Sequence, residues 1–134
     1  MNKWLLPTLL LFAFALTAMP ALAEEKPEVV LGGKVIMVFR ASAGGKTPME
    51  RAVILRQRCV DILSDPGVTE DHVKIVTPKR GEPTIYVGNH IFVTVSRADA
   101  AANKADMQTL AKIWAKNLYE GFSIARVHRP EEKF

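Results

Sequence analysis

The spacing of apolar residues predicts two amphipathic helices in this chain. From Pro48 to about Ser64, apolar side chains recur every three or four positions. They share one face, which is formed by Ala52, Leu55, Cys59, Ile62 and Leu63. Thr47 and Glu50 supply a capping box at the start of this helix, and the sequence Asp65-Pro66-Gly67 ends it.

The second helix is expected from Met107 to about Arg126, with Asp106 as its cap. Its apolar face consists of Leu110, Ala111, Trp114, Ala115, Leu118 and Phe122. Between the predicted helices, residues 96–103 are polar and alanine-rich, and Asp99 can cap a short turn there.

Shorter apolar runs predict the strands. Residues 29–31 suit a small edge strand, whereas residues 35–39 are apolar at every position, which is typical of a strand inside a sheet. Residues 72–77 alternate with period two, and residues 84–87 and 90–95 are also strand-like. Gly88-Asn89 between the last two is a two-residue hairpin turn.

The main elements therefore follow the order β-α-β-β-β-α, which predicts an α+β fold. We expect a two-layer sandwich, with a mainly antiparallel sheet of about four strands and both helices on one face. A single domain would span residues 29–126. A linker at residues 24–28 precedes it, and a flexible charged tail at residues 127–134 follows it.

Residues 1–23 have the three parts of a cleavable export signal. Lys3 is the positive start, residues 4–19 form an uncharged, mostly apolar run, and Ala21 and Ala23 place small residues before a cut at Glu24. The alternative is an uncleaved membrane anchor, but the run is shorter than the roughly 20 residues that span a bilayer. The sequence predicts export to the periplasm, or to the extracellular space if the host lacks an outer membrane.

Composition narrows the classes of function. The chain has 134 residues, 49% of them apolar, and a net charge of +4. That charge is small and dispersed, so it does not indicate nucleic-acid binding, although it can favour anionic lipid surfaces. No apolar stretch after the signal is long enough for a transmembrane span.

No set of residues predicts catalysis or a bound cofactor. Cys59 is the one thiol, and it lies in the middle of an apolar helix face, where cysteine behaves as a small hydrophobe. Gly44-Gly45-Lys46-Thr47 lacks the upstream glycine of a phosphate-binding loop. We therefore expect no enzyme activity and no cofactor.

Two kinds of candidate site remain. His72 and His90 both begin strands, and with neighbouring carboxylates they are the candidates for a metal site, although they lack the spacing of a zinc motif. Lys79 and Arg80 lie at an exposed hairpin tip, where domains often contact partners.

The first predicted helix carries three arginines, two of which are further candidates for contact with a partner. Arg51 and Arg58 are further candidate contacts for an acidic partner. Arg56 lies within the apolar arc of the helix, so its guanidinium needs a partner such as Asp99 or a carbonyl at a strand end.

The order of several short motifs resembles a known family. Arg51-Ala52, Leu55, Arg58 and Cys59 match an RA-x-x-[I/L]-x-x-R-apolar first helix. Asp65-Pro66, Val93-Thr94, Asp99-Ala100 and Leu110-Ala111 follow in the matching order. Over about residues 29–125, the chain resembles the soluble extracytoplasmic N-terminal domain of small-conductance mechanosensitive channel homologues.

The resemblance implies an accessory domain without catalytic residues. In such channels membrane helices follow this domain, whereas this chain stops at Phe134. The implied function is therefore a free-standing interaction or sensing domain, which acts on a membrane channel or transporter in trans or associates with itself. The alternative hypothesis is an exported protein that binds a small ligand or a metal through His72 and His90.

Overall fold

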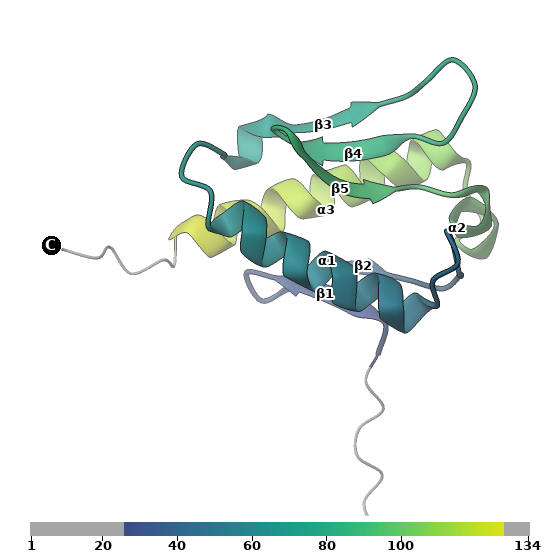
Figure 1. Ribbon diagram of the computed structural model, residues 1–134, viewed down its shortest axis with the longest axis horizontal. Coiled ribbons are helices and arrows are strands. Elements are labelled where there is room, and N and C mark those ends of the chain that lie inside the picture. Colours follow the sequence, from purple (N-terminus) through teal and green to yellow (C-terminus); the bar gives the residue numbers. More distant parts are fainter. Residues whose placement is uncertain (1–25, 128–134) are drawn as a thin grey trace, which may run out of the picture.

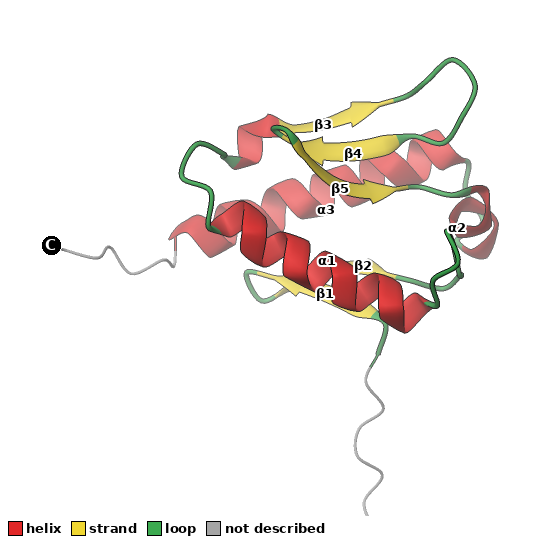
Figure 2. Ribbon diagram, viewed as in Figure 1, coloured by secondary structure: helices red, strands yellow, loops and turns green. Residues whose placement is uncertain are grey.

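The computed structural model describes residues 26–127, which fold into two small sheets and three helices (Figures 1 and 2). In chain order, the elements are β1 (Glu28–Leu31), β2 (Lys34–Val38), α1 (Pro48–Leu63), the 3-10 turn η1 (Glu70–His72), β3 (Val73–Val76), β4 (Thr84–Val87), β5 (His90–Thr94), α2 (Arg97–Ala102) and α3 (Met107–Val127). The predicted signal in residues 1–23 lies outside the described residues, as does the predicted tail from residue 128 onward.

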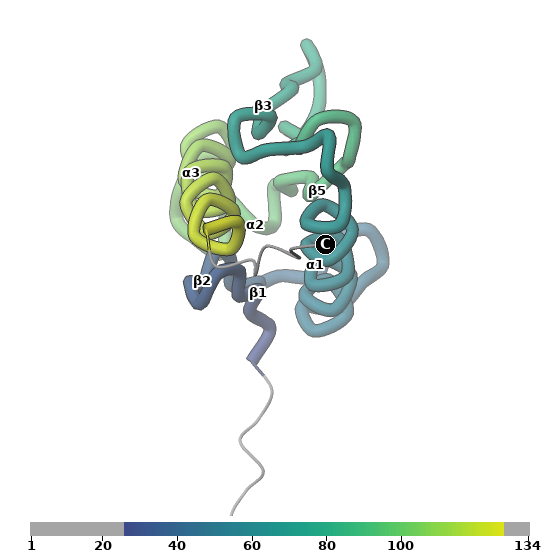
Figure 3. Tube along the Cα trace, turned by 90° about the vertical axis from the view of Figure 1, so that its left-hand side faces the viewer, coloured from purple at the N-terminus to yellow at the C-terminus, as the bar shows by residue number. Residues whose placement is uncertain are grey.

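The α+β class and the antiparallel pairing are confirmed, but the strands belong to two sheets rather than one. One sheet pairs β1 with β2, and the other has the order β3-β4-β5. Seen along the helices, α1 and α3 form two opposite walls between the sheets (Figure 3). Each helix contacts both sheets, so the apolar core lies inside a four-walled arrangement.

Bulges explain why residues 35–39 gave the pattern of an interior strand. Val29 pairs with Met37 and Val30 with Val35, so Ile36 is an extra residue in β2. Because a bulge interrupts the alternation of side chains, Ile36 and Met37 are both buried in a strand of a two-stranded sheet. The prediction of an interior strand was therefore wrong. Phe92 is the corresponding extra residue in β5, and it is buried together with Val93.

Local signals placed the helix ends correctly. Thr47 and Glu50 form both hydrogen bonds of the predicted capping box of α1. Asp106 accepts hydrogen bonds from the backbone and side chain of Thr109 at the start of α3. The domain starts one residue earlier than predicted, because Glu28 already pairs with Val38 in β1.

The elements run back and forth along the domain, so successive connections alternate between its two ends. The loops of residues 39–47, 77–83 and 95–106 share the end that holds α2 and the first turns of α1 and α3 (Figure 1). The connections at residues 32–33, 64–72 and 88–89 lie at the opposite end.

Candidate functional site

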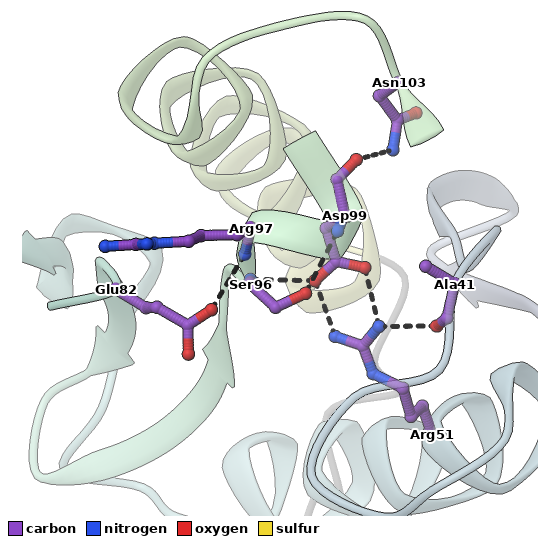
Figure 4. Close-up of polar contacts among 7 residues, drawn as sticks. All are labelled: Ala41, Arg51, Glu82, Ser96, Arg97, Asp99 and Asn103. Atoms are coloured by element: carbon purple, nitrogen blue, oxygen red, sulfur yellow. Dashed lines mark hydrogen bonds and ion pairs between the residues drawn. The ribbon is translucent and has the colours of Figure 1, made fainter. Parts of the chain in front are cut away.

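A buried ion pair joins α1 to α2. The guanidinium of Arg51 donates to both carboxylate oxygens of Asp99, with Nη1–Oδ1 and Nη2–Oδ2 distances of 2.6 and 2.8 Å (Figure 4). Nη1 also donates to the carbonyl of Ala41 at 2.9 Å, and the guanidinium lies over the ring of Phe39. Only 7% of Arg51 and 1% of Asp99 are exposed, so this pair is part of the interior.

The start of α2 holds Asp99 in place. Ser96 and Asp99 form a capping box, in which Asp99 Oδ2 accepts from the Ser96 N–H at 2.9 Å and Ser96 Oγ accepts from the Asp99 N–H. Glu82, from the loop after β3, accepts from the Arg97 N–H (Figure 4). The ion pair therefore connects the loop after β2, α1 and α2 into one rigid region.

The other two arginines of α1 tie the helix to both sheets. Arg56 donates to the carbonyl of Glu28 in β1, so of the two expected partners it has the strand-end carbonyl, whereas Asp99 binds Arg51. Arg58 donates through Nη1 to the carbonyl of the bulged residue Phe92 at 2.7 Å. On the opposite wall, Asn117 of α3 donates to the carbonyl of the other bulged residue, Ile36.

These contacts correct one of the predicted partner residues. Arg51 is wrong as a surface contact, because burial and the bidentate bond to Asp99 remove it from solvent. Arg58 is half-buried, and only its Nη1 has a hydrogen bond within residues 26–127. Lys79 and Arg80 are exposed, as expected for a hairpin tip.

A cavity of about 310 Å³ lies beside the Arg51–Asp99 pair. It is bounded by α1, the loop before α1 and the last part of β5. Its charged lining consists of Lys46, Arg51, Arg58 and Glu82, and its apolar lining includes Ile54, Leu55 and Val93. Because the loop before α1 and the loop after β3 both reach this cavity, it combines residues far apart in sequence.

The three loops at this end of the domain carry most of its exposed positive charge. They contain Arg40, Lys46, Lys79, Arg80, Arg97 and Lys104, all of them exposed, and three acidic residues, Glu82, Asp99 and Asp106. We call these three loops the basic end. The connections at the opposite end contain Asp65, Glu70 and Asp71 and no lysine or arginine. The fold therefore separates charge along its length.

The two histidines line one cavity at the opposite end, together with Asp65. His90 Nε2 hydrogen-bonds Asp65 Oδ2 at 2.8 Å, which lowers the pKa of that carboxyl, and His72 Nδ1 accepts from the Thr69 N–H. Within residues 26–127, no three histidine, cysteine or acidic side chains are arranged to hold a metal ion. His72 and His90 thus share a cavity without belonging to such a group, and their role as metal ligands stays a prediction.

Cys59 is buried on the core face of α1, as predicted. Burial raises the pKa of its thiol to about 12. Because the thiolate is the reactive form, we expect the folded protein to resist iodoacetamide at pH 8, and the thiol to react once the protein is unfolded in guanidinium chloride. Mass spectrometry of the alkylated protein measures both states, and rapid labelling of the folded protein would contradict the buried position.

Sequence reasoning missed several residues of this region. It rejected the Gly44–Thr47 segment as a phosphate loop and used Thr47 as a helix cap, but it did not expect the segment to line a cavity, and it did not single out Glu82 or Arg97. The Ser96-x-x-Asp99 spacing was an available signal for the cap, but nothing local indicated that the same carboxylate also binds Arg51, which is 48 residues away.

A comparison with protein families found one match, over residues 28–125, to a model described as "Domain of unknown function (DUF8459)". No curated protein and no solved structure matches the chain. None of the helices in residues 26–127 combines the length and the apolar character that crossing a membrane requires.

Proposed function

The chain belongs to the DUF8459 family, whose description names no activity, and we propose from its geometry that it is a non-catalytic interaction or sensing domain. In this proposal, the basic end contacts an acidic surface of a membrane protein. The observation that carries it is the concentration of six exposed cations in three loops at one end of the domain.

The arrangement of the basic end suits a docking surface. Lys79 and Arg80 project at the tip of a loop, whereas the region beneath is held rigid by the Arg51–Asp99 pair and by the bond from Arg97 N–H to Glu82. A rigid base reduces the entropy lost on binding, and exposed charges of one sign accelerate encounter with an oppositely charged partner.

The proposal that the domain is non-catalytic rests on the state of its reactive groups. Burial raises the pKa of the Cys59 thiol, and the buried carboxylate of Asp99 is committed to Arg51 and to the Ser96 N–H. These groups stabilise the fold, and a role in chemistry would require the same atoms to be free for a substrate.

We further propose that the domain is exported and that its partner is a channel or transporter that it contacts in trans. The signal-like pattern of residues 1–23 supports export, and the resemblance of the α1 motif to channel-associated domains suggests the class of partner. Self-association through complementary basic and acidic ends is a second form of the same interaction.

Charge reversal at the loop tip tests this proposal. We expect Lys79→Glu with Arg80→Glu to reduce in-cell crosslinking of the tagged, full-length protein to its partner at least several-fold, because attraction becomes repulsion at the contact. The crosslinked species are identified by mass spectrometry, which also reports whether the N-terminus lies at Glu24.

The matched control is Lys112→Glu with Lys116→Glu, which makes the same change of charge on the exposed face of α3. The control is expected to crosslink as well as the original protein. If the loop-tip variant crosslinks to the partner as well as the control does, Lys79 and Arg80 are not part of the contact. Recovery of the protein alone, without a membrane protein, would contradict the trans arrangement.

A further inference from the structure

The cavity beside α1 has hydrogen-bond donors that the fold does not use. Arg58 has one hydrogen bond, from Nη1 to Phe92, which leaves Nε and Nη2 without a protein partner within residues 26–127. The ammonium group of exposed Lys46 forms no hydrogen bond or salt bridge to residues 26–127, and its charge acts on the exposed carboxylate of Glu50 only at longer range. Both side chains line the same cavity.

The remaining charges of the lining favour a ligand with a single negative charge. Asp99 neutralises Arg51, so within the lining Lys46 and Arg58 face Glu82 alone, and the lining keeps one positive charge; Glu50, which interacts with Lys46, lies outside the lining. A dianion such as phosphate would exceed that charge, and Glu82 would repel it about twice as strongly as it repels a monoanion. A carboxylate matches it, because the guanidinium group presents paired N–H groups to two oxygens.

The rest of the lining favours an apolar body on that ligand. Ile54, Leu55 and Val93 supply aliphatic surface next to the two cations. A volume of about 310 Å³ is at the lower end of the range for small-molecule sites, so the ligand has to be small.

From these contacts we propose that the cavity binds a small organic carboxylate. Its carboxylate group lies against Lys46 and Arg58, and its apolar body lies on Ile54, Leu55 and Val93. Such a ligand would occupy the cavity between α1 and β5, next to the loops of the basic end. This site is different from the loop tip proposed to contact a partner, and it needs no partner in order to be occupied.

NMR titration of the 15N-labelled protein tests the proposal with three probes: benzoate, benzyl alcohol and inorganic phosphate. We expect benzoate to shift the amide signals of Gly44, Lys46, Val93 and Thr94, which lie on the cavity wall. Benzyl alcohol has the same ring without the charge, so its affinity should be at least about tenfold lower. Phosphate should also bind more weakly than benzoate.

Lys46→Gln is the test variant, since Lys46 is exposed in a loop, whereas Arg58 also ties α1 to β5. It should weaken benzoate binding about tenfold, and Lys112→Gln on α3 should leave it unchanged. Benzoate shifts outside the cavity, equal affinity for benzoate and benzyl alcohol, tighter binding of phosphate, or no effect of Lys46→Gln would each overturn the proposal.

The same titration separates this proposal from the proposed function. The Lys79→Glu, Arg80→Glu variant should retain benzoate binding even where crosslinking to a partner is lost, because neither residue lines the cavity. Loss of benzoate binding in that variant, with Lys46 intact, would contradict a separate ligand site.

Discussion

Replacing Asp99 with alanine is expected to destabilise the domain by about 3–5 kcal/mol. The change leaves the guanidinium of Arg51 buried without its counter-ion, and it also removes the acceptor for the Ser96 N–H at the start of α2. Removing one partner of a buried ion pair is costly because the remaining charge is neither solvated nor neutralised. Urea unfolding followed by circular dichroism measures the loss as a shift in midpoint.

Two further variants separate the contributions of charge and cap. Asp99→Asn retains one oxygen as the acceptor for the Ser96 N–H, but it removes the charge and puts an NH2 donor opposite Arg51 Nη1. Its loss of stability therefore reports the lost ion pair with Arg51 while the cap is kept. The pair of Glu70 with Arg126, which is partly exposed, is the comparison, and Glu70→Gln, which keeps an acceptor oxygen, should cost only about 0–1 kcal/mol. A loss below about 1 kcal/mol in Asp99→Ala would contradict a buried, structural pair.

Replacing Gly32 with alanine is expected to cost about 3 kcal/mol or more, through two separate effects. Gly32 has a φ of +60°, which strains any residue with a Cβ. An added Cβ would also lie 2.6 Å from the carbonyl oxygen of Gly121 in α3, a backbone atom that cannot rotate away. The hairpin of β1 and β2 and helix α3 would therefore have to separate.

The adjacent glycine provides the control for this prediction. Gly33 also has a positive φ, of +78°, but a Cβ there meets nothing within 4 Å. Gly33→Ala should therefore cost about 1–2 kcal/mol, from backbone strain alone. Unfolding in guanidinium chloride measures the free energy of unfolding of both variants. Equal losses of stability would show that the close approach of Gly32 to α3 does not contribute to stability.

The hydrogen bonds of the three arginines of α1 explain why arginine occurs at these positions. Arg56 and Arg58 donate to carbonyls in β1 and β5, and Arg51 reaches Asp99 in α2. Through these three side chains, α1 joins both sheets and the short helix. A motif with arginines spaced along one helix is therefore compatible with a requirement of the fold, in addition to any contact with a partner.

Local patterns were sufficient to determine the two long helices and what they bury, whereas α2 was expected only as a short turn. The capping boxes, the apolar face of α1 and the interior position of Cys59 involve residues only a few positions apart, so periodicity and capping rules describe them. The Gly88-Asn89 turn between β4 and β5 is local in the same sense.

Features that depend on distant residues were decided only by the tertiary structure. The bulges at Ile36 and Phe92 imitate the pattern of an interior strand, so the division of the strands between two sheets was not visible in the sequence. Asp99 satisfies a local cap, and this concealed its bond to Arg51.

The charge of the chain illustrates the same distinction. Along the sequence the cations are dispersed among three loops, and the acidic connection of residues 64–72 lies between the first and the second of them. Because each strand and each of the two long helices, α1 and α3, runs from one end of the domain to the other, every second connection returns to the same end, and the fold collects the six cations there. The sequence alone determined which residues are charged and which elements separate them. The basic end and its cavity exist only because those elements pack antiparallel around one core.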